Sequence, residues 1–232
     1  MRAIVGLNDI KMTYWYIISN MVYPLSLLFV VSILSNTALL PYALAGGIVS
    51  VLAINGISLA AAIAPMKSDY KYKDLIVSTK TSPAEYLFGE ITAQFLWSMP
   101  SLLIFLAMDI YFGILSFTAF GVSILVGILI TFITSSIAFW ITGIMRNTTN
   151  IWAISIILSF FLVTIAPTFY PYTYLHGNVL SVMMFLPTTS AAMLEQAAFG
   201  LAPMSWYPVI ILVVETIVFL IIAVYFTKWR ED

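Results

Sequence analysis

The charged residues of this chain are separated by long apolar stretches, and this spacing restricts the folds that it can adopt. No residue is charged between Lys11 and Lys67, or between Asp109 and Arg146. Because an α-helix needs about 20 apolar residues to cross the hydrocarbon core of a bilayer, each gap is long enough for at least one membrane span. Charged residues make up only 8% of the chain, too few to cover a soluble protein of this size. The chain is therefore predicted to be an integral membrane protein.

The gaps between charges, together with the turn residues, predict an all-α fold with six transmembrane helices. Asn36, Thr37 and Pro41 mark a turn between the first two spans, and residues 113–116 mark another. The predicted spans are residues 14–34, 42–65, 91–108, 117–145, 151–166 and 206–226. The whole chain, residues 1–232, is expected to form a single membrane domain.

The distribution of Lys and Arg predicts the orientation of these spans. All 9 basic residues lie before the first span, after the last one, or in the loops after the second and fourth spans. The loops after the first, third and fifth spans contain none. Since basic loops stay in the cytoplasm, we expect a multi-pass protein of the cell membrane with both termini inside.

Three segments are neither spans nor short loops. Residues 1–12 mix apolar and charged side chains, as expected for an amphipathic helix lying at the membrane interface. Residues 67–90 form a charged cytoplasmic segment with a short helix, followed by a Ser82–Glu85 capping box that starts the third span. Residues 167–205 are apolar but interrupted by Pro and Gly, which predicts extracellular re-entrant or surface-lying helices before the last span.

The sequence offers little chemistry for an enzyme. It lacks a phosphate-binding loop and a metal-ligand cluster, has no Cys, and has one isolated histidine, His176. Its composition, nearly neutral in net charge, does not favour nucleic-acid binding. We therefore expect no catalytic residue, bound cofactor or metal.

Several polar residues lie within or beside the predicted spans. Glu215 is near the centre of the last span, where a charge costs at least about 2.5–3.5 kcal/mol. It is either a neutral acid bonded to a neighbouring helix or a group of a substrate cavity or a proton pathway. Asn55, Ser58 and Gln94 are candidates for hydrogen bonds between helices or for the substrate path. Asp109, at the end of the third span, is interpreted as a solvated carboxylate.

Three segments in order along the chain resemble the membrane (permease) subunits of ATP-binding cassette exporters of the type 2 class. Residues 74–90 are similar to the stretch that enters the third span of these proteins, residues 145–171 to their basic turn and fifth span, and residues 186–200 to their outer proline and re-entrant helix. The resemblance implies an interfacial connecting helix, a cytoplasmic coupling helix at residues 69–79 and re-entrant helices before the last span.

The resemblance also implies partners and a coupling site. A separate ATPase subunit would hold ATP and magnesium, and a second membrane subunit, identical or related, would complete the transporter in the bilayer. The residues expected to couple this chain to the ATPase are Asn8, Asp9, Lys11, Asp69, Lys71, Lys73, Asp74, Leu75, Ser82 and Glu85.

The predicted function is outward transport of an amphipathic or lipid-like substrate, such as a drug, an antimicrobial peptide or a lipid. Three alternatives remain open at this point: a proton-coupled secondary transporter that uses Glu215, a membrane-embedded lipid-modifying enzyme, and an assembly subunit.

Overall fold

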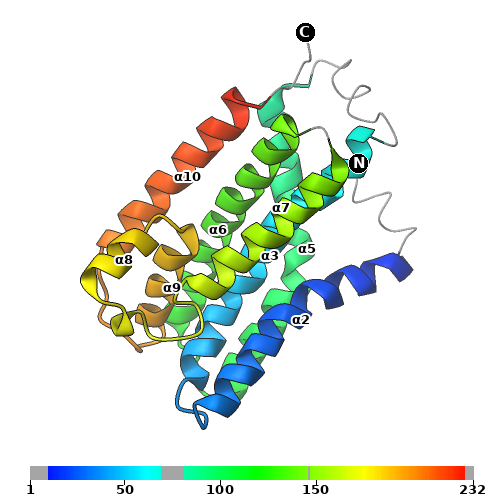
Figure 1. Ribbon diagram of the computed structural model, residues 1–232. Coiled ribbons are helices and arrows are strands. Elements are labelled where there is room, and N and C mark those ends of the chain that lie inside the picture. Colours follow the sequence, from blue (N-terminus) through cyan, green and yellow to red (C-terminus); the bar gives the residue numbers. More distant parts are fainter. Residues whose placement is uncertain (1–9, 69–80, 146, 228–232) are drawn as a thin grey trace.

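The computed structural model describes residues 10–68, 81–145 and 147–227, and within these ranges the chain is a helical bundle without strands (Figure 1). The all-α prediction is confirmed for this part of the chain. The long helices are α2 (Ile10–Leu34), α3 (Leu40–Ser68), α5 (Pro83–Tyr111), α6 (Phe117–Ile144), α7 (Thr148–Phe160) and α10 (Tyr207–Tyr225).

The turns between these helices form where the sequence predicts them. Asn36 and Thr37, in the turn between α2 and α3, have φ of 50° and 68° and so adopt the left-handed conformation. Gly113, directly after α5, has φ of 68°. Ser116 then caps α6, because its side chain accepts a hydrogen bond of 3.0 Å from the backbone N–H of Ala119. Both predicted turns are confirmed.

Five of the described helices are long and apolar enough to cross a membrane. They are residues 40–65, 83–111, 117–144, 148–165 and 207–225, and the count becomes six if the bent pair α8 (Gly177–Met183) and α9 (Pro187–Ala198) forms one span. The first predicted span corresponds to α2. Pro24 lacks the N–H that would continue the backbone hydrogen bonds of this helix. The apolar part of α2, Met21–Leu34, is shorter than the helices counted as spans. A multi-pass membrane protein is therefore established, and the exact set of six spans stays a prediction.

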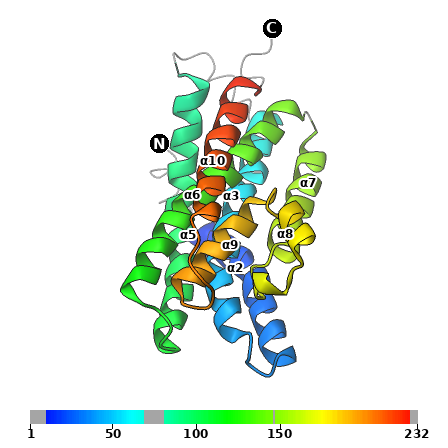
Figure 2. The same ribbon diagram turned by 90° about the vertical axis from the view of Figure 1, so that its left-hand side faces the viewer.

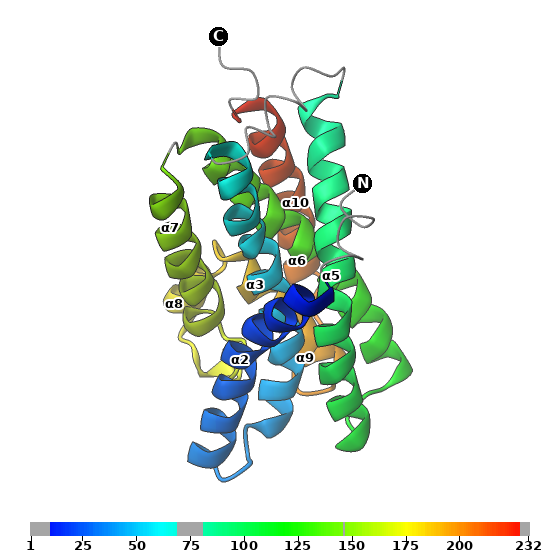
Figure 3. The same cartoon turned by 90° about the vertical axis from the view of Figure 1, so that its right-hand side faces the viewer.

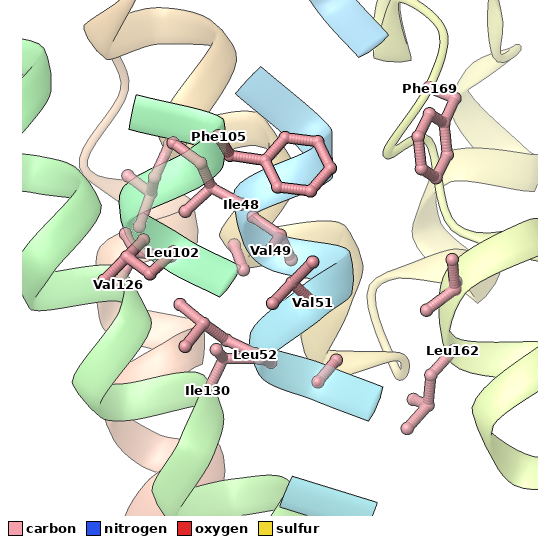
Figure 4. Packing of buried hydrophobic residues seen from close by; sticks show 14 of the residues in the cluster. Ile48, Val49, Val51, Leu52, Leu102, Phe105, Val126, Ile130, Leu162 and Phe169 are labelled. Atoms are coloured by element: carbon pink, nitrogen blue, oxygen red, sulfur yellow. The ribbon is translucent and has the colours of Figure 1, made fainter. Parts of the chain in front are cut away.

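Helix α3 occupies the centre of the bundle. It packs against α2, α5, α6, α7 and α9, and most of its residues between Ala43 and Ala64 are buried (Figure 3). Ile48 and Leu52 lie on the side that faces α5 and α6, as the close-up view shows (Figure 4). Their partners in the same apolar cluster include Leu102, Phe105, Val126, Ile130, Leu162 and Phe169.

The segment after α7 folds into the bundle. α7 continues as a π-helical turn, η1 (Phe161–Ile165), followed by a 3₁₀ turn, η2 (Tyr172–Tyr174), and by α8 and α9, which meet at 116°. α8 has no buried residue, whereas every residue of α9 from Pro187 to Gln196 is buried. α9 packs against α3, α6 and α10 beside α8 (Figure 2). Helices form in this segment as predicted, and α9 lies inside the bundle rather than on its surface. Their extracellular, re-entrant placement stays a prediction.

Candidate functional site: polar groups within the bundle

Helix α5 begins with the capping box that the sequence predicts. The backbone N–H of Ser82 donates to Glu85 Oε2 at 2.8 Å, and the backbone N–H of Glu85 donates to Ser82 Oγ at 3.2 Å. Pro83 occupies the first turn, where its missing N–H has no cost. The box fixes the start of a 29-residue helix immediately after the charged segment.

Most of the predicted coupling residues lie outside the described residues. The backbone of Lys11 belongs to α2. The other coupling residues outside the described ranges are Asn8, Asp9, Asp69, Lys71, Lys73, Asp74 and Leu75. Of the predicted set, the structure therefore brings together only Ser82 and Glu85, at the start of α5.

Three of the predicted substrate-path residues meet between α3 and α5. Gln94 of α5 donates from Nε2 to the backbone carbonyl of Asn55 and, at 2.9 Å, to Ser58 Oγ. Ser58 Oγ in turn donates to the Asn55 carbonyl at 2.6 Å. Because all three groups are bonded to each other, this cluster joins two neighbouring helices, as the interhelical interpretation of these residues predicts.

Glu215 does not belong to that cluster. It lies on α10, is only partly buried, and its Oε2 accepts no hydrogen bond from the described residues. Both interpretations of Glu215, a neutral acid bonded to a neighbouring helix and a group of a substrate cavity or proton pathway, stay predictions.

Two acidic residues are buried on different helices of the bundle. Asp109 of α5 and Glu195 of α9 are both 0% exposed. The prediction of a solvated Asp109 is wrong, because its side chain is fully buried within the bundle. Sequence analysis missed the role of Glu195, although it is the only charged residue between Arg146 and Glu215.

Gln196, next to Glu195, fixes α9 to the segment that follows α7. Its Nε2 donates to the carbonyls of Pro167 and Tyr170 at 2.8 and 3.0 Å, and its Oε1 accepts from the N–H of Tyr172 at 3.2 Å. One buried side chain therefore satisfies three backbone groups of an irregular segment.

The same segment is in direct contact with α3. A Cβ atom on Gly46 would lie 1.5 Å from the carbonyl oxygen of Thr168, so only glycine allows this approach. Thr168 is itself held by a 2.7 Å hydrogen bond from its Oγ1 to the carbonyl of Val163 in η1. Thr164 of η1 is hydrogen bonded to Tyr23 of α2. The π-helical turn is thus connected to both α2 and α3.

These buried groups hold helices together. Among the described residues no group of three or more His, Asp or Glu side chains could hold a metal ion. His176 is exposed and directly precedes α8.

Comparison with known proteins identifies the family. No curated protein matches the chain. A model of the ABC-2 family transporter proteins matches residues 33–225, from the end of α2 to the end of α10. The match includes the capped start of α5, the buried Asp109 and the whole of α9. The chain therefore belongs to the ABC-2 family of transporter proteins, as a membrane permease component that works with a separate ATP-binding subunit.

Proposed function

We propose that this chain is the permease of an ATP-driven exporter that moves an amphipathic or lipid-like molecule out of the cell. The family match over residues 33–225 is the observation that carries the proposal. The sequence also has no phosphate-binding loop of its own, so hydrolysis of ATP would belong to the partner subunit. A second membrane subunit, identical or related, would complete the pathway.

The proposed point of coupling is the charged segment between α3 and α5. Residues 67–80 contain Asp69 and Asp74 together with four lysines on a predicted cytoplasmic face. α5 starts directly after this segment with a hydrogen-bonded capping box and continues for 29 residues. A capped helix transmits a displacement at its end along its axis, whereas a flexible connection absorbs it. This continuity supports a mechanical role for the segment.

The chemistry of the helices favours an amphipathic substrate over a highly charged one. The membrane-spanning helices contain no Lys or Arg except near the ends of α2 and α3. A strongly anionic solute would meet no cationic side chain that could compensate for the loss of its hydration shell. An isolated charge within the bilayer is costly. The cluster of Gln94, Asn55 and Ser58 and the carboxyl of Glu215 stay candidates for contacts with polar parts of the substrate.

Purification of the intact complex from native membranes tests the proposal. A soluble subunit with a phosphate-binding loop should be purified with the chain, and its ATPase activity should rise when a transported amphiphile is added to the complex in lipid vesicles. Asp74→Lys should release the ATPase or abolish this stimulation. Asp232→Lys, which also reverses a carboxylate on the predicted cytoplasmic face, is the matched control and should leave both unchanged.

Other outcomes would contradict the proposal. Transport by the chain alone, driven by a proton gradient without nucleotide, would favour the secondary transporter that uses Glu215. Transport activity that survives Asp74→Lys with the ATPase still bound would show that coupling does not pass through the charged segment.

A further inference from the structure

The first turn of α9 carries three buried hydroxyl groups that lack an oxygen or nitrogen partner in the described part of the chain. Thr188, Thr189 and Ser190 are all 0% exposed. Thr188 Oγ1 and Thr189 Oγ1 have no hydrogen-bond partner there, and Ser190 Oγ donates to the sulfur of Met184 at 3.6 Å. A thioether sulfur is a weak acceptor, and a buried hydroxyl is costly to leave unpaired.

The position of these hydroxyls on the helix explains why they are unpaired. In the middle of other helices, Thr131, Thr134 and Thr216 each donate at 2.7 Å to the carbonyl four residues earlier. In the first turn of α9 that carbonyl would belong to the bend before the helix, and the carbonyl of Leu186 in this bend already accepts from the backbone N–H of Thr189 at 2.8 Å. The three hydroxyls are therefore free to donate to another group.

The start of α9 favours an anionic group as that acceptor. The N-cap residue, Leu186, provides no side-chain cap, and Pro187 follows it in the first turn. The Cα–Cβ bonds of a helix tilt toward its N-terminus, so the hydroxyls project toward the end that carries the partial positive charge. Glu195, the only acid of α9, lies about two turns further along. Helices that begin inside membrane transporters present such ends to anionic groups.

An exposed apolar surface adjoins this turn. α8 meets α9 at 116° and has no buried residue (Figure 2). Val182 of α8 is 70% exposed, and Phe185 of the bend between the two helices is 83% exposed. Met184 lies between them in the sequence but is buried against Ser190. Because a methionine side chain is unbranched and flexible, a change of its rotamer alone can expose the hydroxyls to a molecule at the bend.

We propose that the bend between α8 and α9 binds an amphipathic molecule with one anionic head group. The hydroxyls of residues 188–190 donate to an anionic oxygen, such as that of a phosphate, in place of the Met184 sulfur. The apolar tail lies against the exposed side chains of Val182 and Phe185. The inference rests on the proposed function only in taking this molecule as the transported substrate, because binding requires neither the ATPase nor nucleotide.

Equilibrium binding to the whole chain, immobilised in maltoside micelles that contain no phosphate, tests the site. Radiolabelled decyl phosphate should bind saturably, and excess decyltrimethylammonium, which has the same tail and a cationic head, should not displace it. Thr188→Val with Thr189→Val keeps the shape and removes two donors. Since each hydrogen bond to a charged group is worth about tenfold in affinity, the double variant should bind about a hundredfold more weakly. Thr131→Val, which removes a buried hydroxyl of α6, is the matched control and should bind like the wild type.

A second variant leaves the interior of the bundle unchanged. Phe185→Asn alters an exposed side chain and should weaken the binding of decyl phosphate through the loss of contact with its tail. Absence of saturable binding, equal affinity in the double variant and in Thr131→Val, or displacement by decyltrimethylammonium would overturn the proposal. Inorganic phosphate that competes as well as decyl phosphate would show a site for a free ion and would overturn the amphiphile. Binding without stimulation of the ATPase in the intact complex would support the site and contradict transport of this molecule.

Discussion

Gly46 of α3 offers the sharpest test of how α9 and its neighbouring segment are anchored. An added Cβ would lie 1.5 Å from the carbonyl oxygen of Thr168 and 2.3 Å from its carbonyl carbon. Because protein interiors are close-packed, the Thr168 carbonyl oxygen would have to move by about 2 Å to restore an ordinary contact. This atom belongs to the backbone and not to the end of a flexible side chain, so a change of rotamer cannot relieve the overlap.

The magnitude follows from two opposing effects in the Gly46→Ala variant. Overpacking of a close-packed interior costs about 1–3 kcal/mol, and alanine gains about 1 kcal/mol over glycine in a helix. Since the obstructing atom is a tethered backbone carbonyl, we expect the upper part of the range and a net loss of about 2 kcal/mol in the free energy of unfolding.

Thermal unfolding in detergent, followed by tryptophan fluorescence, measures this difference. Gly121→Ala in α6 is the matched control, because nothing lies within 4 Å of the Cβ that it would add. It should leave the chain equally stable or slightly more stable. If Gly46→Ala unfolded at the same temperature as Gly121→Ala, the contact between α3 and Thr168 would not be as tight as we infer.

Three further substitutions test individual hydrogen-bond groups. Ser82→Ala should destabilise the first turn of α5 by about 1 kcal/mol, seen as faster hydrogen exchange of residues 83–86, whereas Glu85→Gln should preserve the capping box. Gln94→Leu removes two bonds to α3 and should lower the free energy of unfolding by about 1 kcal/mol; an unchanged value would mean that the cluster contributes nothing to helix association. Gln196→Ala should cost about 3 kcal/mol, roughly 1 kcal/mol for each lost bond, and should accelerate exchange of the Tyr172 amide; unaltered exchange there would refute its role as a clamp.

Features that depend on neighbouring residues in the sequence could be predicted. The capping box requires Ser82 and Glu85 three positions apart, and the turn at Gly113 requires a residue that adopts positive φ. The connection of Gln94 to α3 could be anticipated as well, because a buried amide in a membrane helix needs partners on another helix.

The position of α9 could not be predicted in the same way. Its first half is rich in Thr, Ser and Ala, a pattern that is equally compatible with a surface helix and with a buried one. Burial of α9 depends on contacts with α3, α6 and α10, which are distant in the sequence. The error at Asp109 has the same origin, since a carboxyl at the end of a span is solvated unless another element covers it.

The contacts of α9 connect it to α3, one of the two helices that flank the charged segment. Gln196 holds residues 167–172, and these rest against α3 at Gly46. Gly46 lies near the start of α3, whereas the charged segment follows the end of this helix at Ser68. A displacement of α3 along its axis would therefore change the seat of α9 without any direct contact between the two ends.

This arrangement makes a specific demand on the complex with the ATPase. If α9 responds to α3, loosening the contact between α3 and Thr168 should reduce the amount of substrate transported for each ATP hydrolysed. In the reconstituted complex, Gly46→Ala should retain basal ATPase activity, because the variant leaves residues 67–90 unchanged, but should transport less substrate per ATP hydrolysed. Equal transport per ATP in Gly46→Ala and Gly121→Ala would show that the Thr168 contact stabilises the bundle and takes no part in coupling.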